Sequence, residues 1–143
     1  MTDDIESVIL FQLDKASKTA KQYSQREFER LGFGITVEQW ILLKIIHESD
    51  GISQRELADQ SFRDPASITR TLDLLHVRGF IDRLPVPENR RQYRILLTKK
   101  GEQFVAAHMP TIQQHRQKSV EGISVKDLKK LSALLQKIQK NMA

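Results

Sequence analysis

The chain has 143 residues, of which 39% are hydrophobic and 29% charged, a composition typical of one folded domain and not of a disordered segment. It contains no cysteine, which excludes disulfides, thiolate metal sites and cysteine nucleophiles. The first apolar run is too short and interrupted for a signal peptide, and no run approaches the roughly 20 apolar residues that span a bilayer. We therefore expect a cytoplasmic protein that has no membrane partner.

The net charge of +5 is distributed unevenly along the chain. Residues 1–52 carry a net charge of −3, residues 53–94 carry +2, and residues 95–143 carry +6. All eight basic residues of the middle segment are arginines. The excess of positive charge is consistent with a polyanionic partner, and equally with a solvated lysine-rich surface at the C-terminal end.

The first half of the chain predicts a series of helices. Apolar residues at spacings of three and four predict a helix over residues 4–31, which the LGFG segment ends. Thr36 and Gln39 form a capping-box pattern that begins a second helix, and the SDG segment at 49–51 ends it. Ser53 begins a short helix through about Gln60.

A further helix and two strands follow. Asp64 can cap a helix over 65–78, because Pro65 suits its first position and Gly79 closes it. Residues 80–84 and 92–98 are predicted strands, with the arginine-rich segment 85–94 as the hairpin tip. Two helices and a hairpin in this order predict a winged helix-turn-helix.

The remainder of the chain is predicted to be helical. Thr98 can cap a helix to about residue 119, which Pro110 is expected to kink or split. After Gly122, Ser124 begins a last helix whose apolar residues form one seam: Leu128, Leu131, Leu135, Ile138 and Met142. We predict a mainly α fold, with a winged helix-turn-helix domain at 34–100, which carries a small β-hairpin wing, between dimerisation helices at 1–33 and 101–143.

The helix over 65–78 has the pattern of a helix that reads the major groove. Ile68, Leu72 and Leu75 share one side and are expected to pack inward. The residues available for DNA are Pro65, Ala66, Ser67, Thr69, Arg70 and Asp73. Small polar residues let the backbone approach DNA, and an arginine such as Arg70 can bind guanine. The alternative is that Arg70 pairs with Asp73 on an ordinary surface.

The position of the hairpin next to the groove-reading helix gives a reason for the cluster of arginines at its tip. A wing beside a groove-reading helix lies over the minor groove, where arginine inserts. The predicted wing contacts are Asn89, Arg90, Arg91 and Arg94, with Arg94 nearer a phosphate. Residues around the first helix of the motif are candidates for the DNA backbone: Ser53, Gln54, Arg55, Ser61 and Arg63. A role as helix cap alone would explain why serine stands at position 53. For the wing, the alternative is a mobile solvated loop that contacts no DNA.

The run ISQRELADQSFRDPASITRTLDLLHVRGFIDRLPVPENRRQYRILLTKKGEQF resembles the MarR family of bacterial transcription regulators. Its most specific pieces are residues 68–83, the PENRR wing and the LT-KG segment at 97–101. The resemblance implies a homodimer, most often a repressor, that binds double-stranded DNA at a pseudo-palindromic operator. It places Arg70 at the recognition contacts and Arg91 at the minor groove. The family's usual aspartate two positions before that arginine is replaced here by Asn89.

The same resemblance implies that a small aromatic or anionic effector can release the DNA. The candidate pocket residues are Phe11, Trp40, Phe104 and His108. The alternative is that these side chains are ordinary core. His108 and His115 could share a helical face, but one such pair makes a weak metal site, so we predict neither a metal nor a cofactor.

The chain lacks the motifs of an enzyme. It has no glycine-rich phosphate loop, no nucleophile elbow, no HExxH and no convincing catalytic pair, so we predict no catalysis. The alternative function is a winged-helix module for protein–protein interaction. Helical periodicity places Leu74 and Val77 partly on the outer side of the helix over 65–78. They favour that alternative, because a protein-binding face needs an apolar anchor.

Overall fold

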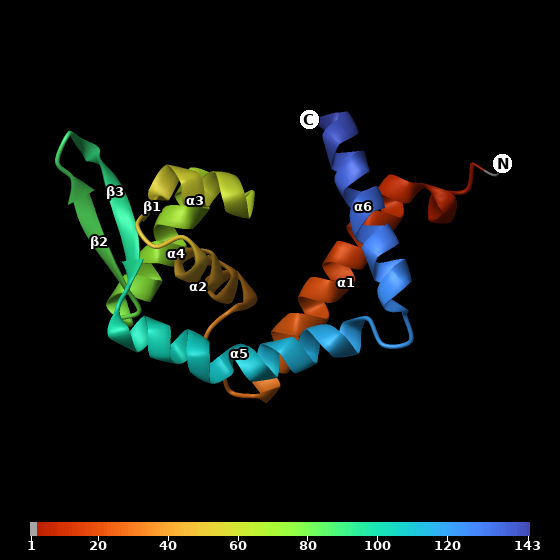
Figure 1. The fold of residues 1–143 in the computed structure, drawn as a ribbon, viewed down its shortest axis with the longest axis horizontal. Helices are drawn as coiled ribbons and strands as arrows, with labels where there is room; N and C mark the ends of the chain where they lie inside the picture. The colour runs from red at the N-terminus through yellow and green to blue at the C-terminus, as the bar shows by residue number, and fades with distance from the viewer. Residues whose placement is uncertain (1–2) are drawn as a thin grey trace. The chain divides into compact units, whose positions relative to one another are not determined.

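The computed structural model of the protein describes residues 3–143, apart from the side chain at position 90. Helices dominate the described residues, as the sequence predicts, together with one small antiparallel sheet (Figure 1). None of the helices in this part of the chain is long and apolar enough to cross a bilayer. In chain order the elements are η1 Ile5–Ser7, α1 Ile9–Arg30, α2 Val37–Glu48, β1 Ile52–Ser53, α3 Gln54–Ser61, α4 Pro65–Val77, β2 Ile81–Val86, β3 Asn89–Leu97, α5 Lys99–Ser119 and α6 Val125–Met142.

Side-chain caps confirm five predicted helix starts. At α2 the capping box is complete, because Thr36 accepts from the N–H of Gln39 at 3.1 Å and the Gln39 side chain accepts from the N–H of Thr36 at 3.0 Å. The other four helices, α3 to α6, each begin where a side-chain oxygen accepts the N–H three residues on, at 3.0 to 3.1 Å. These caps are Ser53, Asp64, Thr98 and Ser124.

The predicted helix over residues 4–31 begins later than expected. A short 3-10 turn, η1, precedes it, and Val8 is extended, with φ −74° and ψ 119°. The Ser7 hydroxyl donates to the carbonyl of Asp4 at 2.7 Å. A serine that bonds its own local backbone competes with helix formation, which explains why α1 starts only at Ile9.

The helix α5 runs through Pro110 without ending, so of the two predicted effects of this proline the split does not occur, and the kink stays a prediction. Proline removes one backbone hydrogen bond, but its fixed φ is close to that of a helix. The remaining bonds of a helix of 21 residues are sufficient to keep it continuous.

The chain divides into two compact units, one that ends at His108 and one that covers Met109–Ala143. The boundary falls within α5, just before Pro110. The first unit contains the sheet and α2 to α4, and the second contains α6. The functional division at residues 33 and 100 stays a prediction.

The sheet has the order β1-β3-β2, with both neighbours antiparallel to β3. β1 was not predicted, since two residues are too few to show an alternating pattern. It pairs Ile52 with Ile95, and Ile95 also lies opposite Arg83 of β2. Ile52, Ile81 and Ile95 are all buried, so the sheet is fixed to the core through one face.

The two strands of the hairpin are longer than predicted. The prediction of a ten-residue tip over 85–94 is therefore wrong. β2 and β3 are separated only by Pro87 and Glu88. The register passes from Pro85 opposite Tyr93 to Val86 opposite Asn89, which leaves residues 90–92 of β3 without partners on β2. Pro85 can lie in β2 because β2 is an edge strand. The wing arginines therefore lie on a strand and its bulge.

The core of the winged part lies between α2, α3, α4 and the sheet, which Figure 1 shows side by side. Its most completely buried side chains are aliphatic and come from all of these elements: Leu43, Ile46, Leu57, Ile68, Leu72, Leu75, Ile81 and Ile95. Close packing of branched side chains fixes how each element is rotated about its own axis.

The outer helices bury little of their apolar surface. In α1 only Phe28 is buried, and no residue of α6 is buried. Of the predicted seam on α6, Leu131 and Met142 are 47% and 61% exposed, whereas Leu128, Leu135 and Ile138 are half-buried. Apolar residues repeated along one face of a helix are normally covered, and within its own unit this face of α6 is only partly covered.

The start of α5 lies against the backbone that precedes β2. Thr98 donates its hydroxyl to the carbonyl of Gly79 at 2.6 Å, and its own N–H bonds the carbonyl of Phe80 at 3.0 Å. Gly101 follows on the same turn, where an added Cβ would lie 2.2 Å from the Phe80 carbonyl oxygen. Only glycine allows this approach.

We predict that Gly101→Ala destabilises the fold by about 1 to 3 kcal/mol, because the new methyl group forces α5 away from Phe80. Urea unfolding followed by circular dichroism measures the change. Gln103→Ala, at an exposed position of the same helix, is the control and should change stability by less than ~0.5 kcal/mol. Equal stabilities of the two variants would contradict the close approach.

Candidate nucleic-acid interface

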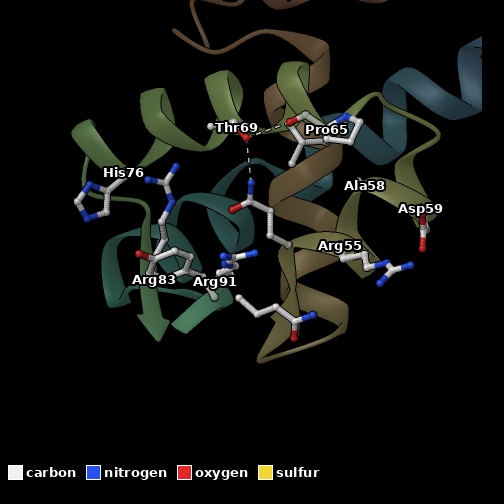
Figure 2. A pocket seen from close by; sticks show the side chains of 12 residues that line it. Arg55, Ala58, Asp59, Pro65, Thr69, His76, Arg83 and Arg91 are labelled. Carbon is white, nitrogen blue, oxygen red and sulfur yellow. Dashed lines mark hydrogen bonds between the residues drawn. The ribbon is translucent and has the colours of Figure 1, made fainter. Parts of the chain in front are cut away.

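A groove of about 820 Å³ lies between α3, α4 and the hairpin (Figure 2). Figure 2 shows His76, Arg83 and Arg91 at one end and Arg55 and Asp59 at the other. Its lining is mostly polar side chains, which are Gln54, Arg55, Ala58, Asp59, Pro65, Ile68, Thr69, His76, Arg83, Arg91, Gln92 and Tyr93. The predicted recognition helix therefore forms one wall of a groove whose other walls are the wing and α3.

The helix α4 has the predicted polar face on its outer side, where Pro65 and Thr69 line the groove. Ile68, Leu72 and Leu75 are at most 1% exposed, which confirms that the predicted side of the helix packs inward. Ser67 is half-buried, and the remaining predicted contacts on α4 are exposed: Pro65, Ala66, Thr69, Arg70 and Asp73. Burial of one side thus orients the polar side outward.

Asp64 holds the first turn of α4. Its carboxylate accepts both the hydroxyl of Ser67, at 2.7 Å, and the Ser67 N–H, at 3.0 Å. These two hydrogen bonds, with a smaller contribution from the charge of Arg70, hold the pKa of Asp64 below its usual value. The Arg70 guanidinium lies 3.4 Å from the Ser67 hydroxyl oxygen, so the three residues form one exposed cluster.

Two side-chain bonds connect α4 to its neighbours. Gln54 of α3 donates to the Thr69 hydroxyl at 3.0 Å, and Thr69 in turn donates to the carbonyl of Pro65 at 2.9 Å, as Figure 2 shows. Arg83 of β2 bonds the Asp73 carboxylate at 2.6 Å. The Arg83 side chain is only 24% exposed and its Nε is buried without a hydrogen-bond partner. Asp73 therefore faces the wing, and the alternative pairing with Arg70 does not form.

The wing arginines differ in their partners. Asn89 accepts the backbone N–H of Arg91 at 3.1 Å, so it shapes the chain at the bulge and leaves the guanidinium of Arg91 to the groove. Arg94 donates to the carbonyl of Gly51 at 3.1 Å, which directs it toward the turn before β1. The side chain of Arg90 lies outside the described part of the structure.

The five candidates for backbone contact are mostly engaged within the protein. Ser53 caps α3, and Gln54 bonds Thr69. Ser61 donates to the carbonyl of Leu57 at 2.7 Å, and Arg63 forms an ion pair with Glu38 of α2. Arg55 is exposed and lines the groove. Among the described residues no ion pair within 4 Å involves Arg55, Arg70 or Arg91, so these three guanidinium groups are not held by carboxylates of the protein at that distance.

The four candidate pocket residues do not form one described cluster. The rings of Phe104 and His108 are in tilted contact, with centroids 4.3 Å apart, and further ring contacts at 4.7 Å join Phe104 to Phe80 and His108 to Phe33. Trp40 on α2 is 3% exposed, and its indole N–H is buried without a partner. Phe11, on α1, is half-buried. This row of aromatic rings, which we call the ring row, brings Phe104 and His108 together. The effector pocket stays a prediction.

Sequence reasoning missed two residues of this surface. Arg83 could not be assigned, because only the fold brings it to Asp73, ten positions earlier. Phe62 ends α3 in the left-handed conformation, with φ 55°, and its side chain is 91% exposed. It is the only described residue other than glycine with a positive φ, a conformation that costs a side chain about 1 kcal/mol. A large apolar residue before an Asp-Pro helix start was the available signal.

Known proteins share this arrangement. Residues 35–93 match the sequence model of the MarR family. The transcriptional regulator SlyA is 26% identical over 99% of this chain and 94% of its own, with a TM-score of 0.81. A mutant MarR from E. coli, complexed with operator DNA, is 24% identical over 96% and 99%, with a TM-score of 0.82. CouR from Rhodococcus jostii RHA1, bound to p-coumaroyl-CoA, is 22% identical over 96% and 95%, also with a TM-score of 0.82.

These matches confirm the resemblance that the sequence indicates. Residues 35–93 match the MarR family model, and the chain as a whole has the fold of these solved MarR-family regulators.

The lowered pKa of Asp64 predicts a pH-dependent contribution to stability. A carboxylate whose pKa is lower in the folded state stabilises the fold above the pKa of the unfolded chain, near 4, and loses this effect as the pH falls. We therefore expect Asp64→Asn to have a lower Tm than the parent at pH 7, and this difference to shrink below about pH 4. Thermal unfolding between pH 3 and pH 7 measures it, and a constant difference would contradict the assignment.

Proposed function

We propose that the protein is a sequence-specific transcriptional regulator that binds a pseudo-palindromic site in double-stranded DNA as a homodimer. The observation that carries this proposal is the outward face of α4, where Arg70 is exposed beside a groove that also contains Arg55 and Arg91. A capped helix with small first residues fits the major groove, and an adjacent wing reaches the minor groove. By blocking a promoter, such a dimer acts as a repressor.

Each group of residues has its own proposed role. Pro65, Ala66, Ser67, Thr69 and Arg70 contact bases or phosphates from α4, and Arg90 and Arg91 enter the minor groove. Arg55 and Arg94 bind phosphates, because cations beside the duplex neutralise its backbone. Ser53, Gln54, Ser61, Arg63 and Asn89 support the interface through bonds within the protein, as does Asp73.

The exposed seam of α6 supports the homodimer. Two copies related by a twofold axis cover each other's seams and present two α4 helices to half-sites about one helical turn apart. The ring row at Phe104 and His108 supports a second, subordinate proposal, in which a small aromatic or anionic effector binds beside it and releases the DNA.

The alternative function, a module for protein–protein interaction, is favoured by one observation. Leu74 and Val77 of α4 are 55% and 83% exposed. We retain DNA as the proposal because the arginines, and not these two residues, border the groove.

Selection of bound sequences from a random duplex pool tests the proposed function. We expect an inverted repeat to be enriched, and affinity for it to fall as salt rises, by about 0.9 log units per log unit of salt for each phosphate neutralised. Absence of any enriched sequence would contradict the proposal and favour the protein-binding alternative.

Arg91→Ala should weaken binding most at sites with A·T-rich flanks, because a narrow minor groove attracts arginine most strongly. Fluorescence anisotropy on matched duplexes with A·T-rich and G·C-rich flanks measures the difference. Arg26→Ala removes one exposed positive charge on α1 and should affect both duplexes equally. An Arg91→Ala variant that behaves like this control would show that the wing assignment is wrong.

Asp73→Asn distinguishes a positioning role from a simple charge effect. Removing a carboxylate near DNA should strengthen binding if charge alone matters. We expect binding to weaken instead, since Arg83 would no longer hold the wing against α4. Asp59→Asn is the matched control, because Asp59 lines the groove and forms no ion pair among the described residues; it should strengthen binding. Stronger binding by both variants would contradict the positioning role.

Leu131→Glu should convert the dimer to a monomer, because it places a charge in the shared seam. Sedimentation velocity at micromolar concentration measures the state, with the exposed neighbour Lys130→Glu as control. A dimer that survives Leu131→Glu would exclude α6 as the dimer interface.

A further inference from the structure

The turn between α3 and α4 exposes one large apolar side chain. Phe62 is 91% exposed, although aromatic rings are usually buried. Its backbone is left-handed, with φ 55° and ψ 39°, a conformation in which glycine would be unstrained. Exposure to water and the left-handed backbone both disfavour an aromatic side chain at position 62. An unfavourable residue at such a position points to a functional contact.

The neighbours of Phe62 are turned back toward the protein. Ser61 bonds the carbonyl of Leu57, and the guanidinium of Arg63 pairs with Glu38. Asp64 is engaged in capping α4. Phe62 is thus the side chain of this turn that extends away from the protein.

The turn adjoins the candidate interface. Asp59 and Pro65, which precede and follow it in the chain, both line the groove, and in Figure 2 they lie at the end away from His76 and Arg83. Phe62 does not line the groove itself; it lies exposed in the turn between these two lining residues, next to the first turn of α4, which is the part of a recognition helix that meets base edges.

The chemistry around Phe62 favours the edge of a base as its partner. A protein hot spot needs an apolar surround that excludes water, whereas the residues beside Phe62 are polar or charged. The carboxylates of Asp59 and Asp64 disfavour close approach of a phosphate. The apolar group that double-stranded DNA presents in its major groove is the 5-methyl group of thymine, with which phenylalanine makes contact.

We propose that Phe62 is a specificity-determining residue that contacts the 5-methyl group of a thymine at the edge of the major groove. This inference rests on the proposed DNA-binding function. It assigns one base preference in each half-site to the turn, in addition to the preferences that α4 provides.

The test uses the enriched duplex, in which each thymine is replaced in turn by uracil, a change that removes only the methyl group. We expect the parent protein to lose affinity at one thymine of a half-site, by roughly fourfold for one methyl group removed from water. Phe62→Gly and Phe62→Ala should bind the unmodified duplex more weakly, and the same uracil replacement should cost them nothing further.

The two variants separate contact from folding. Both lack the ring, but glycine relieves the left-handed strain and alanine does not, so Phe62→Gly should have the higher Tm of the two. Equal losses of affinity at different Tm values support a contact role. If affinity instead follows Tm, the inference is wrong.

The other outcomes are also decisive. Variants that bind as tightly as the parent would overturn the contact, and variants that lose affinity equally with thymine and uracil would overturn the thymine assignment in favour of the sugar. In both cases the proposed function stands. If the parent binds no duplex, the proposed function itself has failed.

Discussion

The burial of one side of α4 is the constraint on which the rest of the interface depends. Ile68, Leu72 and Leu75 have almost no exposed surface, so α4 cannot rotate about its axis without opening the core. Rotation by one residue would carry a polar side chain inward at a cost of roughly 1 to 3 kcal/mol. The outward position of Arg70 therefore follows from the packing of aliphatic side chains on the opposite side.

Packing fixes the rotation of α4, and polar bonds fix what surrounds it. The bond from Gln54 to Thr69 sets α3 against its first turns, and the pair of Arg83 with Asp73 sets the hairpin against its middle. Both bonds lie beside the groove, so the same polar side chains that resemble DNA contacts in the sequence serve partly to shape it. An exposed ion pair contributes little stability, but one that joins two elements restricts their relative movement.

The sequence predicts most of the helices because their signals are local. A cap such as Thr36 or Asp64 and an apolar face such as that of α4 lie within one or two turns, and both appear where they were expected. β1, the length of the hairpin strands and the pairing of Arg83 depend on residues distant in the chain, so no local pattern reveals them. At Pro110 the helix continues, because one proline removes a single backbone hydrogen bond from a helix of 21 residues.

The same distinction applies to the site. Exposure of Arg70, Thr69 and Ala66 could be predicted from helical periodicity, whereas the engagement of Ser61 and Arg63 within the protein could not. Phe62 was overlooked because hydrophobic residues are expected inside, and only the structure shows it outside, in a backbone conformation suited to glycine.

The irregular register at the end of the hairpin divides the wing into a regularly paired base and a bulged end. From Ile81 to Pro85 every residue of β2 has a partner on β3, whereas residues 90–92 have none. Insertions or deletions beyond the Pro85–Tyr93 pair would therefore change the reach of the wing without shifting the pairing at its base. A gene encoding this fold can thus vary how far the wing extends while leaving the packed core intact.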